Sequence, residues 1–169
     1  MSKPTGLFIG RFQPFHNGHM LVLEGMSKVC GKIWIGIGSA KNHHESENPF
    51  TATERREMMQ RALQEKNLIP MFDFNFVELP DEVDDTVWRD AVLEKTGHID
   101  VVWTGNERTA ECFVGTIPVK PIKEVPGISS SEIRALMIAG DEKWKKQVPD
   151  DVALYIGEID GVARVKALV

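Results

Sequence analysis

The chain has 169 residues, of which 42% are hydrophobic and 27% are charged, which is enough for one sizeable core in a single domain over residues 1–169. Its formal net charge of -5 argues against a general nucleic-acid or membrane-surface binder, because such proteins carry a basic field over much of their surface. Any site for anions must therefore be built locally, from a few residues.

The first part of the chain alternates short apolar runs with a longer helical period. Residues 7–9 and 33–37 are apolar runs typical of strands that are buried on both faces. Between them, apolar side chains recur at helical spacing over residues 19–30. Gly31 then predicts a left-handed end to this helix.

The middle of the chain continues the alternation of helices and strands. Thr51 stands three residues before Glu54, which is the pattern of a capping box and predicts the start of a second helix. Phenylalanines alternate with polar residues over 72–77 and predict a third strand. An acidic loop then leads into a helix that carries Trp88 and stops at Gly97.

The last part of the chain adds two strands and several helices. Residues 99–103 predict a fourth strand, and residues 117–122, which contain prolines, predict a fifth strand near a sheet edge, where a missing N–H donor is tolerated. Ser129 and Glu132 have the spacing of another capping box at a helix start. Residues 141–169 predict two or three short helices.

Strands that alternate with helices predict an α/β fold. We expect a doubly wound, Rossmann-like sheet of five parallel strands in the order 3-2-1-4-5, followed by C-terminal helices. In this order the first and fourth strands are neighbours whose connections leave in opposite directions, which opens a crevice at their carboxyl ends. The segments 10–19, 104–106 and 128–134 should meet in this crevice.

Unusual chemistry is concentrated in GRFQPFHNGH at residues 10–19. His16 and His19 can point at one ligand from the first turn of a helix, where free N–H groups favour a phosphate. Arg11 adds a cation, and Gly18 permits close approach of a phosphate or a base to the backbone. In the alternative interpretation, His16 only caps the helix and His19 only lies on its face. Because two histidines occur together with flanking Gly, Pro and Arg residues, ligand binding is favoured over a purely structural role.

The serine-rich segment offers a second site for anions. Ser129, Ser130 and Ser131 supply hydroxyls and N–H groups at a helix start, and Arg134 lies one turn further along. A well-capped surface helix is the alternative, but the expected convergence with the histidines favours phosphate. Asn106 either binds a base or ribose or belongs to a simple turn.

Several familiar motifs are absent from the sequence. There is no G-x-G-x-x-G, no G-x-x-x-x-G-K-[ST] and no G-x-S-x-G, so phosphates should be held by His, Arg and helix ends without a covalent nucleophile. No zinc site is expected, because no Cys or Glu completes a familiar ligand set with the histidines. His43 and His44 either line the mouth of the crevice or lie in a solvated loop.

The cysteines, the apolar runs and the first residues indicate in which cell compartment the protein is expected. Cys30 and Cys112 lie far apart, outside any C-x-x-C pattern, and are interpreted as reduced core cysteines of a cytoplasmic protein. No run of about 18 apolar residues occurs, and no secretory pattern follows the first residues. The sequence therefore predicts a protein that is neither secreted nor membrane-spanning.

The chain resembles the nucleotidylyltransferase superfamily, whose H-x-G-H motif is matched by residues 16–19 and whose I-S-S-x-x-I-R-type motif is matched by residues 128–134. The resemblance is closer still to the small archaeal-type nicotinamide mononucleotide adenylyltransferases. The matching segments, which span nearly the whole chain in order, are GRFQPFHNGH at 10–19, IGIGSA at 35–40, NPFTATER at 48–55, the Trp88 region, TGN at 104–106 and EIDGVARVKAL at 158–168.

This resemblance implies that ATP and nicotinamide mononucleotide give NAD and pyrophosphate by in-line attack, with His16, His19 and Arg134 as the catalytic residues. It implies Mg²⁺ carried mainly by the ATP phosphates, no protein metal site and a homo-oligomer. Neither nucleic acid nor membrane is expected as a partner, because the net charge is negative. The implied ATP-binding residues are Gly10, Arg11, Phe12, His16, Gly18, His19, Gly105, Asn106, Ile128, Ser129, Ser130, Ser131 and Arg134. The implied residues for nicotinamide mononucleotide are Ser39, Ala40, Asp85 and Trp88.

By this resemblance, Trp88 would stack on the nicotinamide ring. The residues alone favour a different interpretation, in which Trp88 is a core residue on one side of a helix with Ala91 and Val92. The chain departs from the family at Asp85, where an Asn is expected, and a carboxylate there should favour the nicotinamide over the nicotinate mononucleotide. It departs again at Glu107-Arg108, where apolar residues are expected, which puts the adenine contacts in doubt.

Two rival functions remain. One is transfer to another acceptor, such as pantetheine phosphate, glycerol phosphate or a flavin; GRFQPFH in place of a T-F-D-P-type opening argues against it. The other is a nucleotide-sensing protein without turnover, which the intact histidines and Arg134 disfavour.

Overall fold

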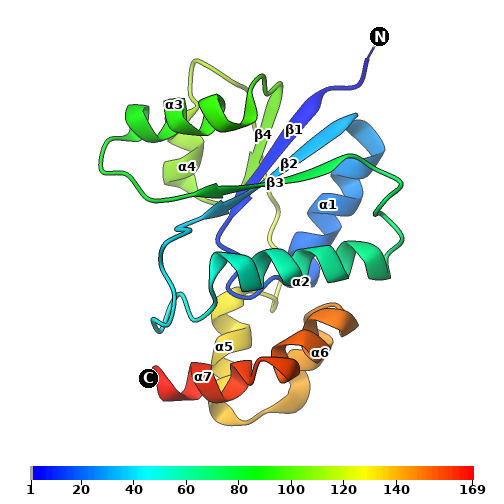
Figure 1. The fold of residues 1–169 in the computed structure, drawn as a ribbon, viewed down its shortest axis with the longest axis vertical. Helices are drawn as coiled ribbons and strands as arrows, with labels where there is room; N and C mark the ends of the chain where they lie inside the picture. The colour runs from blue at the N-terminus through cyan, green and yellow to red at the C-terminus, as the bar shows by residue number, and fades with distance from the viewer. Residues whose placement is uncertain (1) are drawn as a thin grey trace.

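The computed structural model describes residues 2–169 and is built on one parallel sheet (Figure 1). The sheet order β3-β2-β1-β4-β5 confirms the predicted 3-2-1-4-5 topology. Each strand pairs in parallel with its neighbours, and β1 pairs with both β2 and β4. The strands are β1 Thr5–Gly10, β2 Lys32–Gly38, β3 Phe74–Leu79, β4 Val101–Thr104 and β5 Val119–Pro121. The short, proline-containing β5 forms an edge, as predicted.

Helices cover both faces of the sheet (Figure 1). One face carries α1 Asn17–Val29 and α2 Ala52–Glu65, and the other carries α3 Asp85–Thr96 and α4 Glu107–Cys112. The chain ends in a group formed by α5 Ser130–Ala139, the 3₁₀ helix η1 Glu142–Lys146, α6 Asp150–Glu158 and α7 Gly161–Ala167. This group packs against α2 through α6. The expected C-terminal helices are therefore confirmed.

The core has two parts because the sheet is buried on both faces. Along β1, Phe8 belongs to the larger cluster with α1, α2 and the C-terminal helices, whereas Leu7 and Ile9 belong to the cluster under α3 and α4. Successive side chains of a strand point to opposite faces, and both faces are buried. This explains why β1 and β2 are nearly continuously apolar. This arrangement leaves the polar residues to the loops at the strand ends.

Helix starts gather at the edge where the strands end. The residues that cap α1, α3 and α4 follow β1, β3 and β4, and their side chains accept backbone N–H groups; these caps are His16, Asp84 and Asn106. Thr51 caps α2 through the predicted capping box with Glu54. Because helix starts attract anions, this edge is the natural place for a phosphate ligand.

Two local predictions are wrong. Helix α1 ends at Cys30 in extended backbone, and Gly31 is not left-handed; a side chain at Gly31 would meet Lys3 at 3.3 Å, so close packing explains this glycine. At α5, Ser129 caps the helix, but Glu132 accepts from the Ser129 hydroxyl at 3.3 Å and does not complete the box. The Glu132 N–H still donates to the Ser129 hydroxyl at 3.1 Å, but the Glu132 side chain does not accept the Ser129 N–H.

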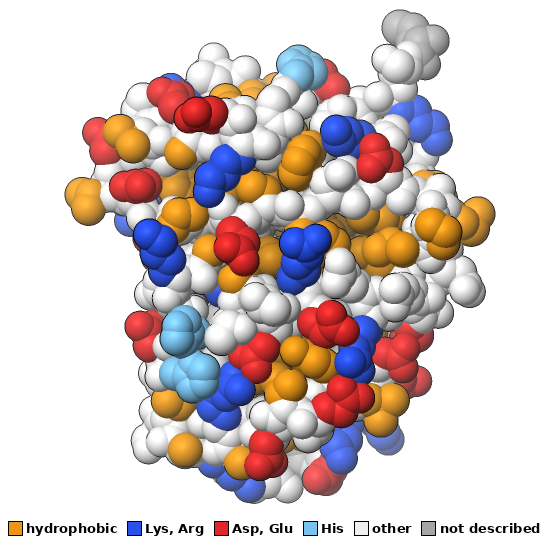
Figure 2. Space-filling model, viewed as in Figure 1, with side chains coloured by type: hydrophobic (Ala, Val, Ile, Leu, Met, Phe, Trp, Pro, Cys, Tyr) orange, Lys and Arg blue, Asp and Glu red, His pale blue; other side chains and the backbone are white. Residues whose placement is uncertain are grey.

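The surface mixes charges of both signs. On the face seen in Figure 2, acidic and basic side chains are interspersed, without one large basic area. Within residues 2–169, no helix is both long and apolar enough to cross a membrane.

Candidate active site

The three segments expected to meet do meet, around a cavity of about 200 Å³ that we call the histidine pocket. Outside the cavity lining, direct bonds join two of the segments: the Ser130 hydroxyl donates to the Pro14 carbonyl at 2.9 Å, and Arg134 Nη1 donates to the Gln13 carbonyl at 2.9 Å. The lining residues are Phe8, Ile9, Gly10, His16, Gly18, His19, Thr104, Gly105, Asn106, Ile122, Lys123, Glu124, Val125, Ile128 and Ser129. The convergence follows from the strand order, as predicted.

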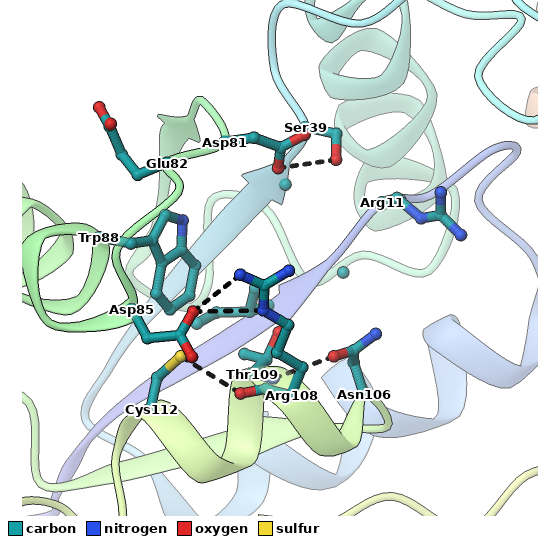
Figure 3. Close-up of a pocket in the computed structure, with 13 residues that line it drawn as sticks. Arg11, Ser39, Asp81, Glu82, Asp85, Trp88, Asn106, Arg108, Thr109 and Cys112 are labelled. Atoms are coloured by element: carbon teal, nitrogen blue, oxygen red, sulfur yellow. Dashed lines mark hydrogen bonds and ion pairs between the residues drawn. The ribbon is translucent and has the colours of Figure 1, made fainter.

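Figure 3 shows the residues that line a second cavity, of about 520 Å³, which we call the Trp88 pocket. Its volume is within the range of small-molecule sites. Ile9, Gly10 and Asn106 line both pockets, so the two meet at the end of β1. The other lining residues are Arg11, Gly38, Ser39, Asp81, Glu82, Asp85, Trp88, Arg108, Thr109 and Cys112.

The two histidines of the first pocket form a capping box with each other. The His16 Nδ1 atom accepts the His19 backbone N–H at 3.3 Å, and His19 Nδ1 accepts the His16 backbone N–H at 3.1 Å. A neutral imidazole whose Nδ1 accepts carries its proton on Nε2. Capping therefore leaves both rings with an Nε2–H donor for a ligand, so the structural and functional interpretations of this pair are compatible.

Packing keeps both rings neutral. They stack with centroids 3.5 Å apart and an interplanar angle of 18°. Burial lowers the pKa of His16 to about 4, and burial together with the neighbouring His16 ring lowers the pKa of His19 well below its usual value. Gly18 makes room for this stack, because a side chain there would lie 2.9 Å from His16 Cε1. This reason for Gly18 could not be read from the sequence.

The depressed pKa of His16 predicts a loss of stability in acid. An unfolded histidine titrates near 6.5 and folded His16 near 4, so between these pH values the unfolded chain binds more protons and stability falls as the pH falls. We expect His16 to account for a loss of roughly 3 kcal/mol between pH 7 and pH 4. The comparison is denaturant unfolding of the wild type and His16→Asn, in which Asn keeps a capping oxygen. Equal losses in the two proteins would contradict this.

Arg11, which lines the Trp88 pocket, lies close enough to two other arginines to affect their pKa values. Burial, and then the charge of Arg11, lower the pKa of Arg134. Burial is likewise the main cause that lowers the pKa of Arg55 to about 10, and Arg11 again acts in the same direction. Carboxylates offset this effect at Arg55, because Glu78, Asp81 and Glu54 raise its pKa, whereas at Arg134 the carboxylate that acts in this way is Glu47.

Arg55 is a residue of the site that the sequence interpretation missed. It is fully buried on α2, and its Nη1 atom donates to the carbonyls of Arg11 at 2.9 Å and Gly38 at 2.7 Å. Nη2 donates to the Ser39 carbonyl at 3.2 Å. These carbonyls belong to the walls of the Trp88 pocket. The available signal was an arginine at helical spacing with buried Met58 and Met59.

Three of the four residues implied for nicotinamide mononucleotide line the Trp88 pocket, and Ala40 does not. Trp88 is partly buried and stands edge-on to Phe113 at 5.9 Å, and it lines the pocket together with Ser39 and Asp85. The Ala40 side chain packs against the core instead. Figure 3 shows Trp88, Asp85 and Arg108 next to one another.

Other predicted residues lie at the margin. Phe12 is buried against the His19 ring, with centroids 4.9 Å apart, and lines neither pocket. Ser131 is exposed in the first turn of α5. Cys30 is buried as expected, whereas Cys112 is partly buried, packs against the core cluster under α3 and α4 and also lines the Trp88 pocket. His43 and His44 are exposed and line neither pocket, which favours the solvated-loop interpretation.

Comparison with known proteins identifies relatives over most of the chain. A family model described as cytidylyltransferase-like matches residues 7–136. The nicotinamide-nucleotide adenylyltransferase of Thermococcus sibiricus is 43% identical over 166 residues, which cover 96% of this chain and 88% of that protein. The enzyme of that name from Thermoplasma acidophilum is 37% identical over 172 residues, which cover 98% and 92%.

Solved structures share the fold. A bifunctional NMN adenylyltransferase/ADP ribose pyrophosphatase from Francisella tularensis, complexed with AMP and Mn ion, has a TM-score of 0.70 at 20% identity over 99% of this chain and 52% of that one. The Plasmodium falciparum nicotinic acid mononucleotide adenylyltransferase complexed with NaAD has a TM-score of 0.68 at 16% identity over 95% and 98%. From the family match and the sequence relatives, the chain belongs to the cytidylyltransferase-like family of nucleotidylyltransferases, and within it to the nicotinamide-nucleotide adenylyltransferases.

Proposed function

We propose that this chain transfers AMP from ATP to nicotinamide mononucleotide, giving NAD and pyrophosphate. The observation that carries the proposal is the junction of the two pockets, which share Ile9, Gly10 and Asn106. ATP in the histidine pocket and the mononucleotide in the Trp88 pocket would bring their phosphates together at this junction. Relatives named nicotinamide-nucleotide adenylyltransferase, at 37–43% identity over nearly the whole chain, support the same reaction.

The reaction is a direct displacement at phosphorus. A phosphate oxygen of the mononucleotide attacks the α-phosphorus of ATP, and the bond from that phosphorus to the oxygen bridging the β-phosphate breaks as the new bond forms. Pyrophosphate leaves with the electron pair, and no covalent enzyme intermediate is formed. Such a transfer depends on positioning and charge stabilisation, and not on a protein nucleophile.

The histidine pair would act on the ATP phosphates. Each ring offers an Nε2–H donor fixed by its capping bond, so both donors are oriented before ATP binds. Arg11 and Arg134 would hold the phosphate chain, and the start of α5, with Ser129, Ser130 and Ser131, would add N–H and hydroxyl donors. Asn106 keeps its amide NH₂ for the base or ribose, since its oxygen caps α4 by accepting the Thr109 N–H at 2.9 Å.

In the second pocket, Trp88 would stack on the nicotinamide ring while Ser39 and Asp85 line its surroundings. The Ser39 hydroxyl already donates to Asp81 at 3.0 Å, which fixes this wall of the pocket. The hydrogen bonds from Arg55 to the backbone of Arg11, Gly38 and Ser39 would keep the wall in place.

A divalent metal is expected to enter with ATP, and we propose Mg²⁺. The imidazole and guanidinium groups of the histidine pocket suit phosphate oxygens, whereas Mg²⁺ prefers oxygen ligands. Across residues 2–169, no three His, Cys, Asp or Glu side chains are grouped as metal ligands, so the phosphates would carry the ion. Mg²⁺ bound in this way would neutralise charge on the departing pyrophosphate. The AMP and Mn ion bound to the Francisella tularensis protein support a divalent metal.

The proposal is tested with purified protein, ATP, Mg²⁺ and a panel of phosphate acceptors. We expect pyrophosphate release and NAD, identified by mass, from nicotinamide mononucleotide, with much lower rates for pantetheine phosphate, glycerol phosphate and flavin mononucleotide. Binding of ATP without product would instead support a nucleotide-sensing protein. Faster turnover of another acceptor would assign the chain to a different reaction of the superfamily.

A further inference from the structure

The Trp88 pocket contains an ion pair between two helices (Figure 3). Arg108 on α4 reaches Asp85 in the first turn of α3, and its Nε and Nη2 atoms lie 3.2 and 3.0 Å from Asp85 Oδ1. The two side chains remain 68% and 49% exposed, so the pair contributes little to folding. Its position inside a cavity therefore points to a role in recognising a ligand.

The geometry of this pair leaves one acceptor and one donor beside each other. Both contacts use Asp85 Oδ1, so Oδ2 is left to accept a hydrogen bond from a ligand. The pair uses Nε and Nη2 of the guanidinium, which leaves Nη1 as a donor. A primary carboxamide has the complementary arrangement, with an oxygen that accepts and an NH₂ group that donates.

The pair also stands next to the ring expected to bind the pyridine base. Asp85 and Trp88 are three residues apart on α3 and therefore lie on the same side of the helix. Figure 3 shows the carboxylate and the guanidinium close to the Trp88 ring. A base stacked on Trp88 would place its ring substituent within the reach of both groups.

We propose that Arg108 and Asp85 together set the preference between nicotinamide mononucleotide, the amide form, and nicotinate mononucleotide, the acid form. This inference rests on the proposed function. The amide satisfies both groups. The acid is attracted by Arg108 and repelled by Asp85, because a carboxylate cannot donate to Oδ2. Each residue therefore shifts the preference in the opposite direction to its partner, and the intact pair favours the amide.

The test measures kcat/KM for nicotinamide and nicotinate mononucleotides with ATP and Mg²⁺. In Arg108→Met, Asp85 is left without its cation, so the preference for the amide should rise by about tenfold or more. In Asp85→Asn, the repulsion is removed while an acceptor oxygen remains, so the preference should fall by about tenfold or more. The double variant should return to within about threefold of the wild-type ratio, because the two shifts oppose each other.

A matched control comes from an ion pair outside the pocket on the same helix. Arg89 Nη2 lies 3.1 Å from Asp90 Oδ1, and neither residue lines the Trp88 pocket, so Arg89→Met should leave the ratio unchanged. The shifts in the pocket variants should appear mainly in KM, since the ring substituent is remote from the reacting phosphorus. A general loss of structure would lower both activities together and would not change their ratio.

The outcomes separate this inference from the proposed function. Opposite shifts in the two single variants are the expected result. If the wild type makes NAD from nicotinamide mononucleotide but the two ratios stay near the wild-type value, or move in the same direction, the inference is wrong and the proposed function stands. If the wild type does not convert nicotinamide mononucleotide, both are wrong.

Discussion

Replacement of His19 by alanine is expected to lower kcat by about 10²–10³, which corresponds to about 3–4 kcal/mol of transition-state stabilisation. The reason is the loss of an Nε2–H donor that is oriented before the substrate binds. His19 Nδ1 accepts the His16 N–H at 3.1 Å, and the ring stacks on His16 and Phe15 and meets Phe12 edge-on. Steady-state turnover with ATP and nicotinamide mononucleotide measures the effect.

The same substitution also removes half of the capping box, which costs about 1 kcal/mol of stability. Thermal unfolding separates this structural loss from the catalytic one, because a folded variant with low kcat places the defect in the reaction. The matched control is His98→Ala: His98 is exposed, precedes β4 at the opposite end of the strand from the pockets, and pairs with Asp100 at 2.7 Å. Turnover of His19→Ala at the wild-type level would assign this residue to structure alone.

Replacement of Arg55 by methionine should lower the free energy of unfolding by roughly 3–5 kcal/mol. Methionine fills much of the volume but has no donors, so the carbonyls of Arg11, Gly38 and Ser39 would lose their hydrogen bonds. Each buried carbonyl left in this state costs about 1–3 kcal/mol. Urea unfolding of the purified variant gives the value.

The neighbouring arginine supplies the control for this prediction. Arg56 is exposed on the same helix, with its guanidinium carbon 5.1 Å from the centre of the Phe76 ring, so Arg56→Met should cost less than about 1 kcal/mol. Arg55→Lys should be intermediate, because an ammonium keeps the charge but cannot reproduce the planar set of donors. Arg55→Met as stable as Arg56→Met would show that water or the backbone replaces these bonds.

The fold could be predicted because its signals are local. Apolar runs and helical periods located every strand, and Thr51 with Glu54 formed the predicted capping box. The sheet order then followed from general rules for parallel strands and brought the histidine and serine segments together. Local signals failed where a tertiary contact competed, as at Gly31, which is explained by its contact with Lys3.

The site could be predicted only in part. The H-x-G-H motif identified the histidines, but the sequence left capping and ligand binding as alternatives. In the structure both rings cap the helix through Nδ1, which leaves each with an Nε2–H donor, so the two interpretations are compatible. Arg55 was missed because the hydrogen-bond partners that tie it to the pocket wall lie 16, 17 and 44 residues away. Arg108 was noticed only as a departure from the family, since its partner Asp85 is 23 residues away.

The sequence by itself therefore determined the order of strands and helices, the Thr51 and Ser129 helix caps and the presence of the H-x-G-H histidine pair, because these depend on residues close together in the chain or on general rules of topology. The tertiary structure decided which groups are buried, how the histidine rings are protonated and which charges meet in the Trp88 pocket. These properties depend on distances between residues far apart in the chain, such as Ser130 and Pro14 at 2.9 Å. Burial and charge proximity set a pKa, and both exist only after the chain has folded.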